Sequence, residues 1–237
     1  MKLINLTNID ISPQKALYEL NLEIIRCNLC PRLSNYIEHT GKTKVKRFIY
    51  EDYWAKPLPS FGDPRARLLL IGLAPAAHGG NRTGRMFTGD SSGEWVAKAM
   101  FETGFSNMPS SKYKDDGLIL KDAYITAVIR CAPPKNKPNI SELLNCSKYL
   151  LAELKTLDQT IKVVLTLGKI AFNSYCQANN LKGLVFNHGA SYNIGNDGRK
   201  TLLVSYHPSR QNTNTGKLTW QMWIEIFKTA KSMIENK

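Results

Sequence analysis

Four short apolar segments, separated by longer stretches with helical patterns, most constrain the fold of this 237-residue chain. Most of them are rich in Leu, Ile or Val, which is typical of parallel strands covered on both faces. They span residues 67–73, 123–129, 162–167 and 201–206. This strand–helix alternation predicts an α/β fold, a three-layer α/β/α arrangement with a central, mainly parallel four-stranded sheet.

Helical patterns fill the intervals between these segments. The first pattern begins with Ser12-Pro13, a favoured pair of cap and first-turn residue. The predicted helices span residues 12–26, 92–103, 141–157, 169–181 and 218–235. The stretch between the first helix and the first strand is expected to be a long loop, and residues 104–117 a polar surface loop. Without an internal repeat or a domain boundary, residues 1–237 are expected to form one domain with an N-terminal helical segment.

The charge balance favours nucleic acid as a partner. The chain carries 32 Lys and Arg residues against 19 Asp and Glu residues, a net charge of +13. A positive field attracts nucleic acid, and the release of condensed counterions adds salt-dependent affinity. A charge surplus that only aids solubility is the alternative, but basic residues also gather in loops, at residues 42–47 and 135–137.

No segment of the sequence has the length and character of a membrane span. The longest apolar run, residues 68–77, is interrupted by Gly72 and Pro75. The first residues also lack the basic-then-apolar pattern of a signal peptide. A cytoplasmic, nucleoid-associated setting is therefore expected, in which spaced cysteines more often bind metal than form disulfides.

Four cysteines stand in two separated pairs. Cys27 and Cys30 form a tight Cys-x-x-Cys pair, whereas fourteen residues separate Cys131 from Cys146. Structural zinc usually uses two tight pairs, while a four-cysteine iron–sulfur cluster tolerates wider spacing. A [4Fe–4S] cluster is favoured over zinc, and four buried cysteines without a metal are the remaining alternative. Cys176 lies in a helical pattern and is expected to be a small core residue.

A glycine-rich stretch, residues 72–93, follows one predicted strand and leads into a helix. Its six glycines in 22 residues allow backbone amides to approach a ligand closely. The stretch matches neither a Walker loop nor Gly-x-Gly-x-x-Gly, so by itself it indicates only a ligand-binding or anion-binding loop. Phe87 and Asp90 lie among the glycines, which argues against a merely flexible surface loop.

Several motifs together resemble the uracil-DNA glycosylases of family 5, the b type of thermophilic bacteria and archaea. Residues 72–90, Gly-Leu-Ala-Pro-Ala-Ala-His-Gly-Gly-Asn-Arg-Thr-Gly-Arg-Met-Phe-Thr-Gly-Asp, are similar to the first motif of this family. His207-Pro208-Ser209 and residues 212–219 are similar to its last motif. The four cysteines and the Cys-Ala-Pro-Pro-Lys-Asn-Lys-Pro loop at residues 131–138 match as well, so the resemblance covers nearly the whole chain.

The resemblance implies a uracil-DNA glycosylase fold, a [4Fe–4S] cluster held by the four cysteines, and hydrolytic removal of deaminated bases from DNA. The substrates implied are uracil and other deaminated bases such as hypoxanthine. Other branches of the superfamily carry Asp, Asn or Glu soon after the first glycine, where Leu73 and Ala74 stand here. The catalytic acid therefore cannot be transferred from those branches.

Cleavage of the bond between sugar and base places positive charge on the sugar and negative charge on the departing base. The resemblance places the functional histidine of the family at His207, as donor to the base. Phe87 is expected to stack on a base that has left the helix. Asp90 is a candidate for orienting water or stabilising the sugar cation, and capping of the next helix is an equal alternative.

Other residues of the motifs are weaker candidates. Asn136 is expected to bind the base edge or a phosphate, with a plain turn residue as the alternative. The remaining substrate-binding candidates are Gly72, Leu73, Ala74, Pro75, His78 and Asn81. The candidate phosphate contacts are Arg82, Arg85, Lys135, Lys137 and Arg210.

The expected partner is uracil-containing DNA, single- or double-stranded, and no membrane. A monomer is expected, and a sliding clamp is a candidate partner. The cluster is expected to be structural, clamping the loop at residues 131–146 against the N-terminal helix. Two rival functions stay open: a non-catalytic iron–sulfur protein that binds nucleic acid on the same fold, and a zinc-bearing nucleotide hydrolase.

Overall fold

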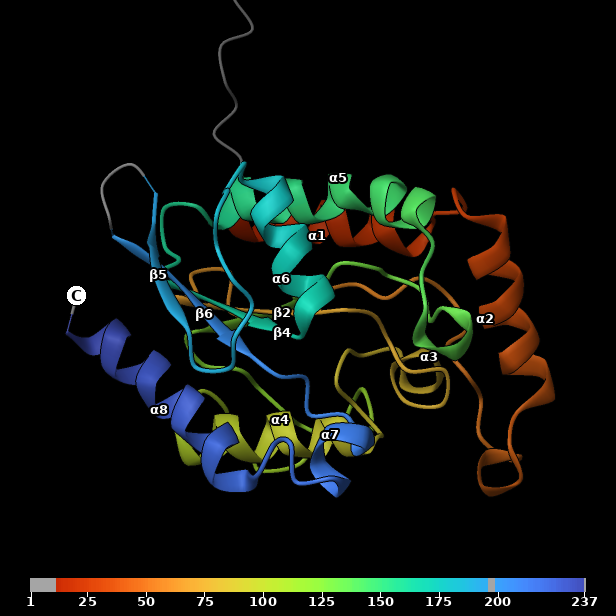
Figure 1. The fold of residues 1–237 in the computed structure, drawn as a ribbon. Helices are drawn as coiled ribbons and strands as arrows, with labels where there is room; N and C mark the ends of the chain where they lie inside the picture. The colour runs from red at the N-terminus through yellow and green to blue at the C-terminus, as the bar shows by residue number, and fades with distance from the viewer. Residues whose placement is uncertain (1–11, 196–198, 237) are drawn as a thin grey trace, which may run out of the picture.

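The computed structural model describes residues 12–195 and 199–236, arranged as three layers (Figure 1). The first eleven residues, which entered the prediction that a signal peptide is absent, lie outside the described residues. The middle layer is a six-stranded sheet in the order β1-β3-β2-β4-β6-β5. The predicted three-layer α/β/α architecture is confirmed.

The four central strands of the sheet are the four predicted ones, and they run parallel. They are β2 (Leu68–Gly72), β3 (Ala123–Ala127), β4 (Val163–Leu167) and β6 (Lys200–Ser205). All side chains of β2, β3 and β4 are buried, as expected of strands that helices cover on both faces. The apolar runs therefore predicted both the position and the direction of this part of the sheet.

Two antiparallel edge strands were not predicted. β1 (Phe61–Gly62) pairs with β3, and β5 (Ser191–Ile194) pairs with β6. β1 has only two residues, too few to show any periodicity. β5 buries only Ile194 and is otherwise exposed or partly exposed. Its sequence, Ser-Tyr-Asn-Ile, resembles that of a loop.

Five helices cover the two faces of the sheet (Figure 1). α1 (Pro13–Ile25), α5 (Ile140–Leu157) and α6 (Lys169–Ala178) lie on one face, and α4 (Ser91–Glu102) and α8 (Trp220–Glu235) lie on the other. All five begin within two residues of their predicted starts. The described part of the chain contains no helix of sufficient length and apolarity to cross a membrane.

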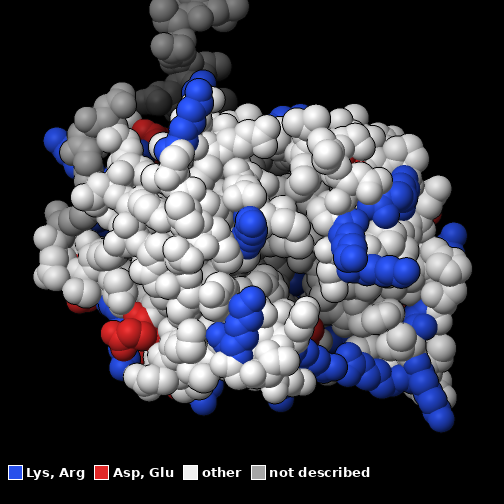
Figure 2. Space-filling view, viewed as in Figure 1, with Lys and Arg blue, Asp and Glu red and all other residues white. Residues whose placement is uncertain are grey.

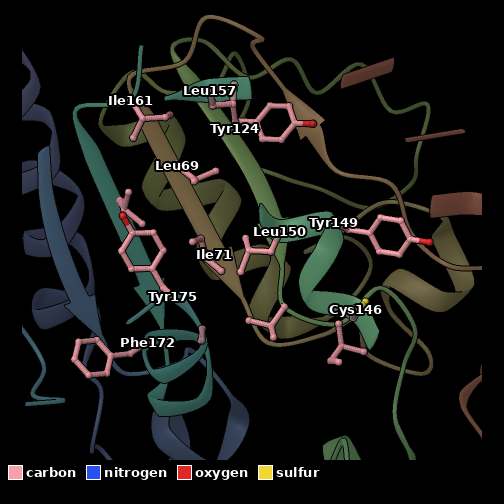
Figure 3. Packing of buried hydrophobic residues seen from close by; sticks show 14 of the residues in the cluster. Leu69, Ile71, Tyr124, Cys146, Tyr149, Leu150, Leu157, Ile161, Phe172 and Tyr175 are labelled. Carbon is pink, nitrogen blue, oxygen red and sulfur yellow. The ribbon is translucent and has the colours of Figure 1, made fainter. Parts of the chain in front are cut away.

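Each face of the sheet packs against its helices through a separate apolar cluster. On the α5 face, Leu69 and Ile71 of β2 point toward that helix, where Leu150 meets them (Figure 3). Cys146, in the first half of α5, and Tyr149, near its middle, belong to the same cluster (Figure 3). The cysteine-bearing turn of α5 is therefore part of the core that supports the sheet.

Helix α2 (Pro31–Thr43) was wrongly predicted to be loop. It buries only Leu33, Ile37 and Thr40, a narrow stripe with one residue per turn, and Gly41 lies near its end. The i, i+4, i+7 spacing of these residues is helical, and Pro31 occupies the first position, so the sequence carried a signal that the prediction missed. The position of α2 matters, because it begins directly after Cys30 and packs near the short helix α3 (Gly80–Thr83).

A buried ion pair joins the sheet to α5. Arg130 is 1% exposed, and its Nη2 lies 2.6 Å from Oε2 of the fully buried Glu153. The same carboxylate oxygen accepts a hydrogen bond from Thr126 of β3 at 2.5 Å, and Arg130 also donates to Ser60. Breaking a buried pair costs about 3–5 kcal/mol. The pair therefore fixes Arg130, which immediately precedes Cys131.

Candidate functional site

A wide pocket opens at the carboxyl ends of the parallel strands, where ligands bind in sheets of this type. Its empty volume, counted out to the solvent at its mouth, is about 1470 Å³. The segments that follow β2, β3 and β6 supply most of its walls. Its lining comprises Leu73, Ala74, Pro75, Ala76, Met86, Phe87, Asp90, Ser91, Ser92, Ala127, Lys135, Asn136, Lys137, His207, Ser209, Arg210 and Gln211.

Phe87 and His207 face each other in this pocket. Their ring centroids are 6.1 Å apart with 30° between the planes. Phe87 adopts a left-handed backbone, with φ of 49°, which turns its ring onto Gly72. A Cβ at position 72 would lie 2.8 Å from Cζ of Phe87, so only glycine leaves room for the ring. Gly72 thus acts by shaping the pocket.

The imidazole of His207 is neutral at pH 7, because burial lowers its pKa to about 4. No hydrogen bond to its ring nitrogens forms within residues 12–195 and 199–236. Its backbone is fixed instead, since the carbonyl accepts hydrogen bonds from the Asn212 side chain and the Ser209 amide, each at 2.8 Å. His207 therefore presents an unused ring N–H to the pocket.

Asp90, the residue immediately before α4, lines the same pocket. Its Oδ1 accepts a hydrogen bond from the Gly93 amide at 2.9 Å, so the predicted helix cap is present. Burial raises the pKa of Asp90, and hydrogen bonds from the amides of Gly93 and Ser92 oppose that rise. A side chain at Gly79 would overlap Oδ2. Asp90 is both a cap and a pocket carboxylate.

The basic loop after Cys131 forms the opposite rim. Lys135, Asn136 and Lys137 are exposed and line the pocket. Lys135 and Asn136 are consecutive non-glycine residues in the left-handed region, with φ of 55° and 56°. Such conformations cost about 1–3 kcal/mol each and persist only where the surroundings impose them. Arg210, also exposed, contributes to the rim and donates to Ser91 Oγ at 3.3 Å.

Two residues that the sequence did not single out hold this loop. Arg32 of α2 donates to both carboxylate oxygens of Glu142 of α5, at 2.8 and 2.7 Å. The same guanidinium reaches the carbonyl of Lys137 at 3.2 Å, and Glu142 accepts the amide of Asn139 at 2.7 Å. This Arg32–Glu142 latch connects the segment after Cys30 to the pocket rim.

The predicted phosphate contacts Arg82 and Arg85 are corrected by the structure, because both are buried and fully engaged. Arg82 forms an ion pair with Glu51 and donates to the carbonyl of Gly89 at 3.1 Å. Arg85 binds both carboxylate oxygens of Asp116, at 2.8 and 2.9 Å. These contacts hold the glycine-rich loop in place.

His78 and Asn81 do not line the pocket either. Nδ1 of His78 lies 3.0 Å from the Tyr53 hydroxyl, and burial together with nearby arginines lowers the pKa of His78. Asn81 is fully buried, and its amide nitrogen is 3.4 Å from the carbonyls of Ile37 and Ala77. Both predicted substrate contacts are instead support for α3. Ser91, Ser92, Met86 and Gln211, which sequence reasoning missed, do line the pocket.

The four cysteines of the two predicted pairs line one small cavity, with an empty volume of about 320 Å³. Cys27 and Cys30 lie between α1 and α2, Cys131 follows β3, and Cys146 is on α5. Burial and the neighbouring thiols raise the pKa of Cys131, and burial raises that of Cys146 to about 11. Cys176 is buried on α6, as predicted for a core residue.

The same cavity is mostly apolar, with Leu29, Leu33 and Ile129 in its wall. The Asn145 amide lies 3.6 Å from Sγ of Cys30. Among the residues that the structure describes, no group of three or more His, Cys, Asp or Glu side chains is arranged to hold a metal ion. The convergence of the four segments was expected, whereas what the thiols bind stays a prediction.

The surface charge follows the composition. Figure 2 shows many more Lys and Arg side chains than acidic ones on the face that it displays. Three basic residues of the pocket rim, Lys135, Lys137 and Arg210, add to this positive surface. A polyanion that approaches the pocket would therefore meet attractive charge at its mouth.

Comparison with known proteins agrees with this fold. The profile of the Uracil DNA glycosylase superfamily matches residues 59–231, from β1 into α8. The chain is 47% identical to the type-5 uracil-DNA glycosylase of Thermus thermophilus, over 87% of this chain and 93% of that protein. It is 41% identical to that of Pyrobaculum aerophilum, over 87% and 88%, and 42% identical to that of Mycobacterium tuberculosis, over 92% and 82%. The chain belongs to the type-5 uracil-DNA glycosylases.

Proposed function

We propose that this protein hydrolyses the bond between uracil and deoxyribose in DNA and leaves an abasic site. The observation that carries the proposal is the arrangement of Phe87, neutral His207 and Asp90 around one pocket with a basic rim. Family membership and the relatives' names support it. The target base must leave the stack to enter such a pocket.

Phe87 provides a stacking surface for the base. Every base has a π face, and stacking on an aromatic ring is worth about 1–3 kcal/mol per base. The absence of a side chain at Gly72 leaves room for the ring in this position. Binding on Phe87 brings the edge of the base toward His207, whose ring lies across the pocket.

His207 donates a hydrogen bond to the oxygen of the departing base. Negative charge develops on that oxygen as the bond to the sugar breaks, and a fixed donor stabilises it. Because the pKa of His207 is lowered to about 4, the donor is a neutral imidazole over the physiological pH range. A neutral donor lowers the barrier without transferring its proton to the base.

Asp90 supplies the opposite charge. Positive charge develops on the sugar, and an ionised carboxylate beside it stabilises the cation or orients the attacking water. Its Oδ1 is bound by the Gly93 amide, which fixes the carboxylate. The hydrogen bond that caps α4 therefore also holds the carboxylate in position for its catalytic role.

The wall formed by Leu73, Ala74 and Pro75 favours a broad range of bases. It offers no side-chain donor or acceptor, so it imposes shape but no side-chain hydrogen-bond pattern on a base. Among the described residues, the amides of Ala74 and Ala76 donate no hydrogen bond, and they are proposed to bind a carbonyl oxygen of the base. Hypoxanthine, which also carries a carbonyl, is therefore proposed as a second substrate.

A [4Fe–4S] cluster is proposed for the cysteine cavity. Burial raises the pKa of the Cys131 and Cys146 thiols, and the positive charge of a bound cluster core would favour their thiolate forms. Each thiolate binds a different iron of such a cluster. The four sulfurs therefore need not surround one point, as they do around a single zinc ion. When bound, the cluster would tie α1, α2 and α5 to the loop after β3.

The test is excision from an oligonucleotide with one uracil, scored as strand cleavage at the abasic site after alkali. Matched substrates with hypoxanthine, xanthine or 5-hydroxymethyluracil define the range. Tight binding without cleavage of any substrate would favour the alternative, a non-catalytic protein that binds nucleic acid. Iron and sulfide analysis of the purified protein tests the cluster, and zinc without iron would reject it.

A further inference from the structure

The loop after α2 presents an aromatic side chain directly to solvent. Tyr50 is 98% exposed and the adjacent Ile49 is 47% exposed, in a loop that begins with a short 3₁₀ turn, Lys46–Phe48. Tyr18 and Tyr113, two other exposed tyrosines, are only 64% and 58% exposed. Nothing within the described structure covers the ring of Tyr50.

This loop is nevertheless fixed. The ring of Phe48 packs against two guanidinium groups. Its centroid lies 4.3 Å from Cζ of Arg47 and 3.9 Å from Cζ of Arg82. Arg82 also forms an ion pair with Glu51, and its carbonyl accepts the amide of Trp54 at 2.9 Å. Tyr50 is therefore displayed on a rigid support, which lowers the entropy cost of using it in binding.

The support of the loop is shared with the pocket. The guanidinium of Arg82 that holds Phe48 and Glu51 also donates to the carbonyl of Gly89 at 3.1 Å. Gly89 lies between Phe87 and Asp90. Figure 1 shows the loop after α2 at the same end of the molecule as α3. The loop thus extends from the wall that carries the pocket residues.

The charge around Tyr50 suits a polyanion. Lys46 and Arg47 of the same loop are exposed, as is Lys42 in the last turn of α2. The two acidic neighbours are partly compensated, since Glu51 is paired with Arg82, and Asp52 lies 3.9 Å from Lys44. The outward charge that remains is positive.

We propose that residues 46–50 form a second DNA contact outside the pocket. Lys46 and Arg47 bind phosphates of the strand that carries the target base, and Tyr50 stacks on an unpaired base flanking it. This inference rests on the proposed function, because it takes DNA as the ligand. Stacking on Tyr50 requires a free base face, so the contact is stronger with single-stranded DNA than with a duplex.

Fluorescence anisotropy with labelled oligonucleotides that carry a stable abasic-site analogue tests this contact. Tyr50→Ala is expected to weaken single-strand binding about five- to tenfold, and Tyr50→Phe to stay within about twofold. Lys46→Ala is expected to reduce the slope of log K against log salt by about 0.7. Tyr18→Ala, on α1, is the matched control and should bind as the wild type does.

Shortening the oligonucleotide on one side of the analogue should abolish the Tyr50→Ala effect, and equal shortening on the other side should preserve it. Unchanged affinity of Tyr50→Ala for the full-length single strand would overturn the proposal, as would an equal loss in Tyr18→Ala. Uracil excision by the wild-type protein is measured alongside. If the wild type excises no uracil, the proposed function fails; if it excises and Tyr50→Ala binds normally, only the loop contact fails.

Discussion

The pocket and the cysteine cavity differ in nearly every physical respect, although one segment of chain contributes to both. The pocket has about 1470 Å³ of empty volume, mixed polar and apolar walls and an exposed basic rim. The cavity has about 320 Å³, apolar walls and four thiols. Cys131 and Cys146 belong to the cavity, while Lys135–Lys137 between them belong to the pocket.

This difference indicates a division of roles. A site that acts on a large substrate must stay open, whereas a site that only holds the chain is best closed and dry. The two left-handed residues of the rim, Lys135 and Asn136, need an external restraint. The Arg32–Glu142 latch provides one such restraint, and the cluster proposed for the cysteine cavity would provide another. Each prediction below tests one side of this division.

The largest effect is expected from the cavity. Cys131→Ser should remove one cluster ligand, abolish the visible absorption and lower the iron content. Loss of a metal centre belongs to the few changes that cost more than about 4–5 kcal/mol, which lowers Tm by about 10–20 °C in a chain of this size. Cys176→Ser is the control and should keep its iron. A coloured Cys131→Ser variant with normal Tm would show that Cys131 is not a cluster ligand.

Replacing His207 should have the opposite signature, a loss of rate without a loss of fold. Removal of one donor to a developing negative charge typically costs about 10²–10³ in rate. His207→Ala should therefore slow single-turnover excision by about that factor while Tm and iron content stay normal. His39→Ala, an exposed histidine of α2, is the control. Equal rates for the two variants would remove His207 from the mechanism.

Asp90→Asn separates capping from chemistry, because Asn caps helices about as well as Asp does. Single-turnover excision should fall about 10- to 100-fold. Since burial raises the pKa of Asp90, ionising it costs stability in the folded state, and this cost appears as pH rises through the raised pKa. At pH 7 the Asn variant should therefore be as stable as the wild type or slightly more stable. An unchanged rate in this variant would show that Asp90 acts only as the helix cap.

The same group sets the acid limb of the pH profile. Excision needs the ionised carboxylate, so the rate should fall as pH decreases through the pKa of Asp90, which lies above its ordinary value. His207 stays neutral down to about pH 4 and contributes no limb near neutrality. The pH dependence of kcat/KM should show this limb in the wild type and lose it in Asp90→Asn. A limb that persists in the variant would assign it to another group.

The sequence allowed the four central strands and most pocket walls to be predicted, because both depend on local patterns. The apolar run at the start of β2 predicted this strand, and all five of its residues are buried. Phe87, Asp90 and His207 belong to motifs that could be identified in the sequence. What sequence could not predict are choices made by tertiary contact. Whether an arginine such as Arg85 faces DNA or a buried Asp116 depends on residues far along the chain.

The latch shows the same limit. Arg32 and Glu142 are 110 positions apart, and each alone reads as an ordinary surface charge. Arg32 reaches Glu142 of α5 because α2 begins directly after Cys30 and places the guanidinium beside that helix. No feature of either residue's neighbourhood indicated that they meet or that Lys137 lies beside them.

The smallest predicted effect tests whether the two regions are coupled. Arg32→Ala removes the latch but neither a cysteine nor a pocket residue, so the rim becomes more mobile and Asn136 is held less well. We expect KM to rise about five- to tenfold with little change in kcat, because the loss falls on positioning of DNA at the rim. Lys148→Ala, which breaks the exposed pair with Glu23 between α5 and α1, is the matched control and should change neither constant. If Arg32→Ala lowers iron content or Tm and leaves KM unchanged, the latch serves the cavity alone and the pocket rim is held by the cysteines.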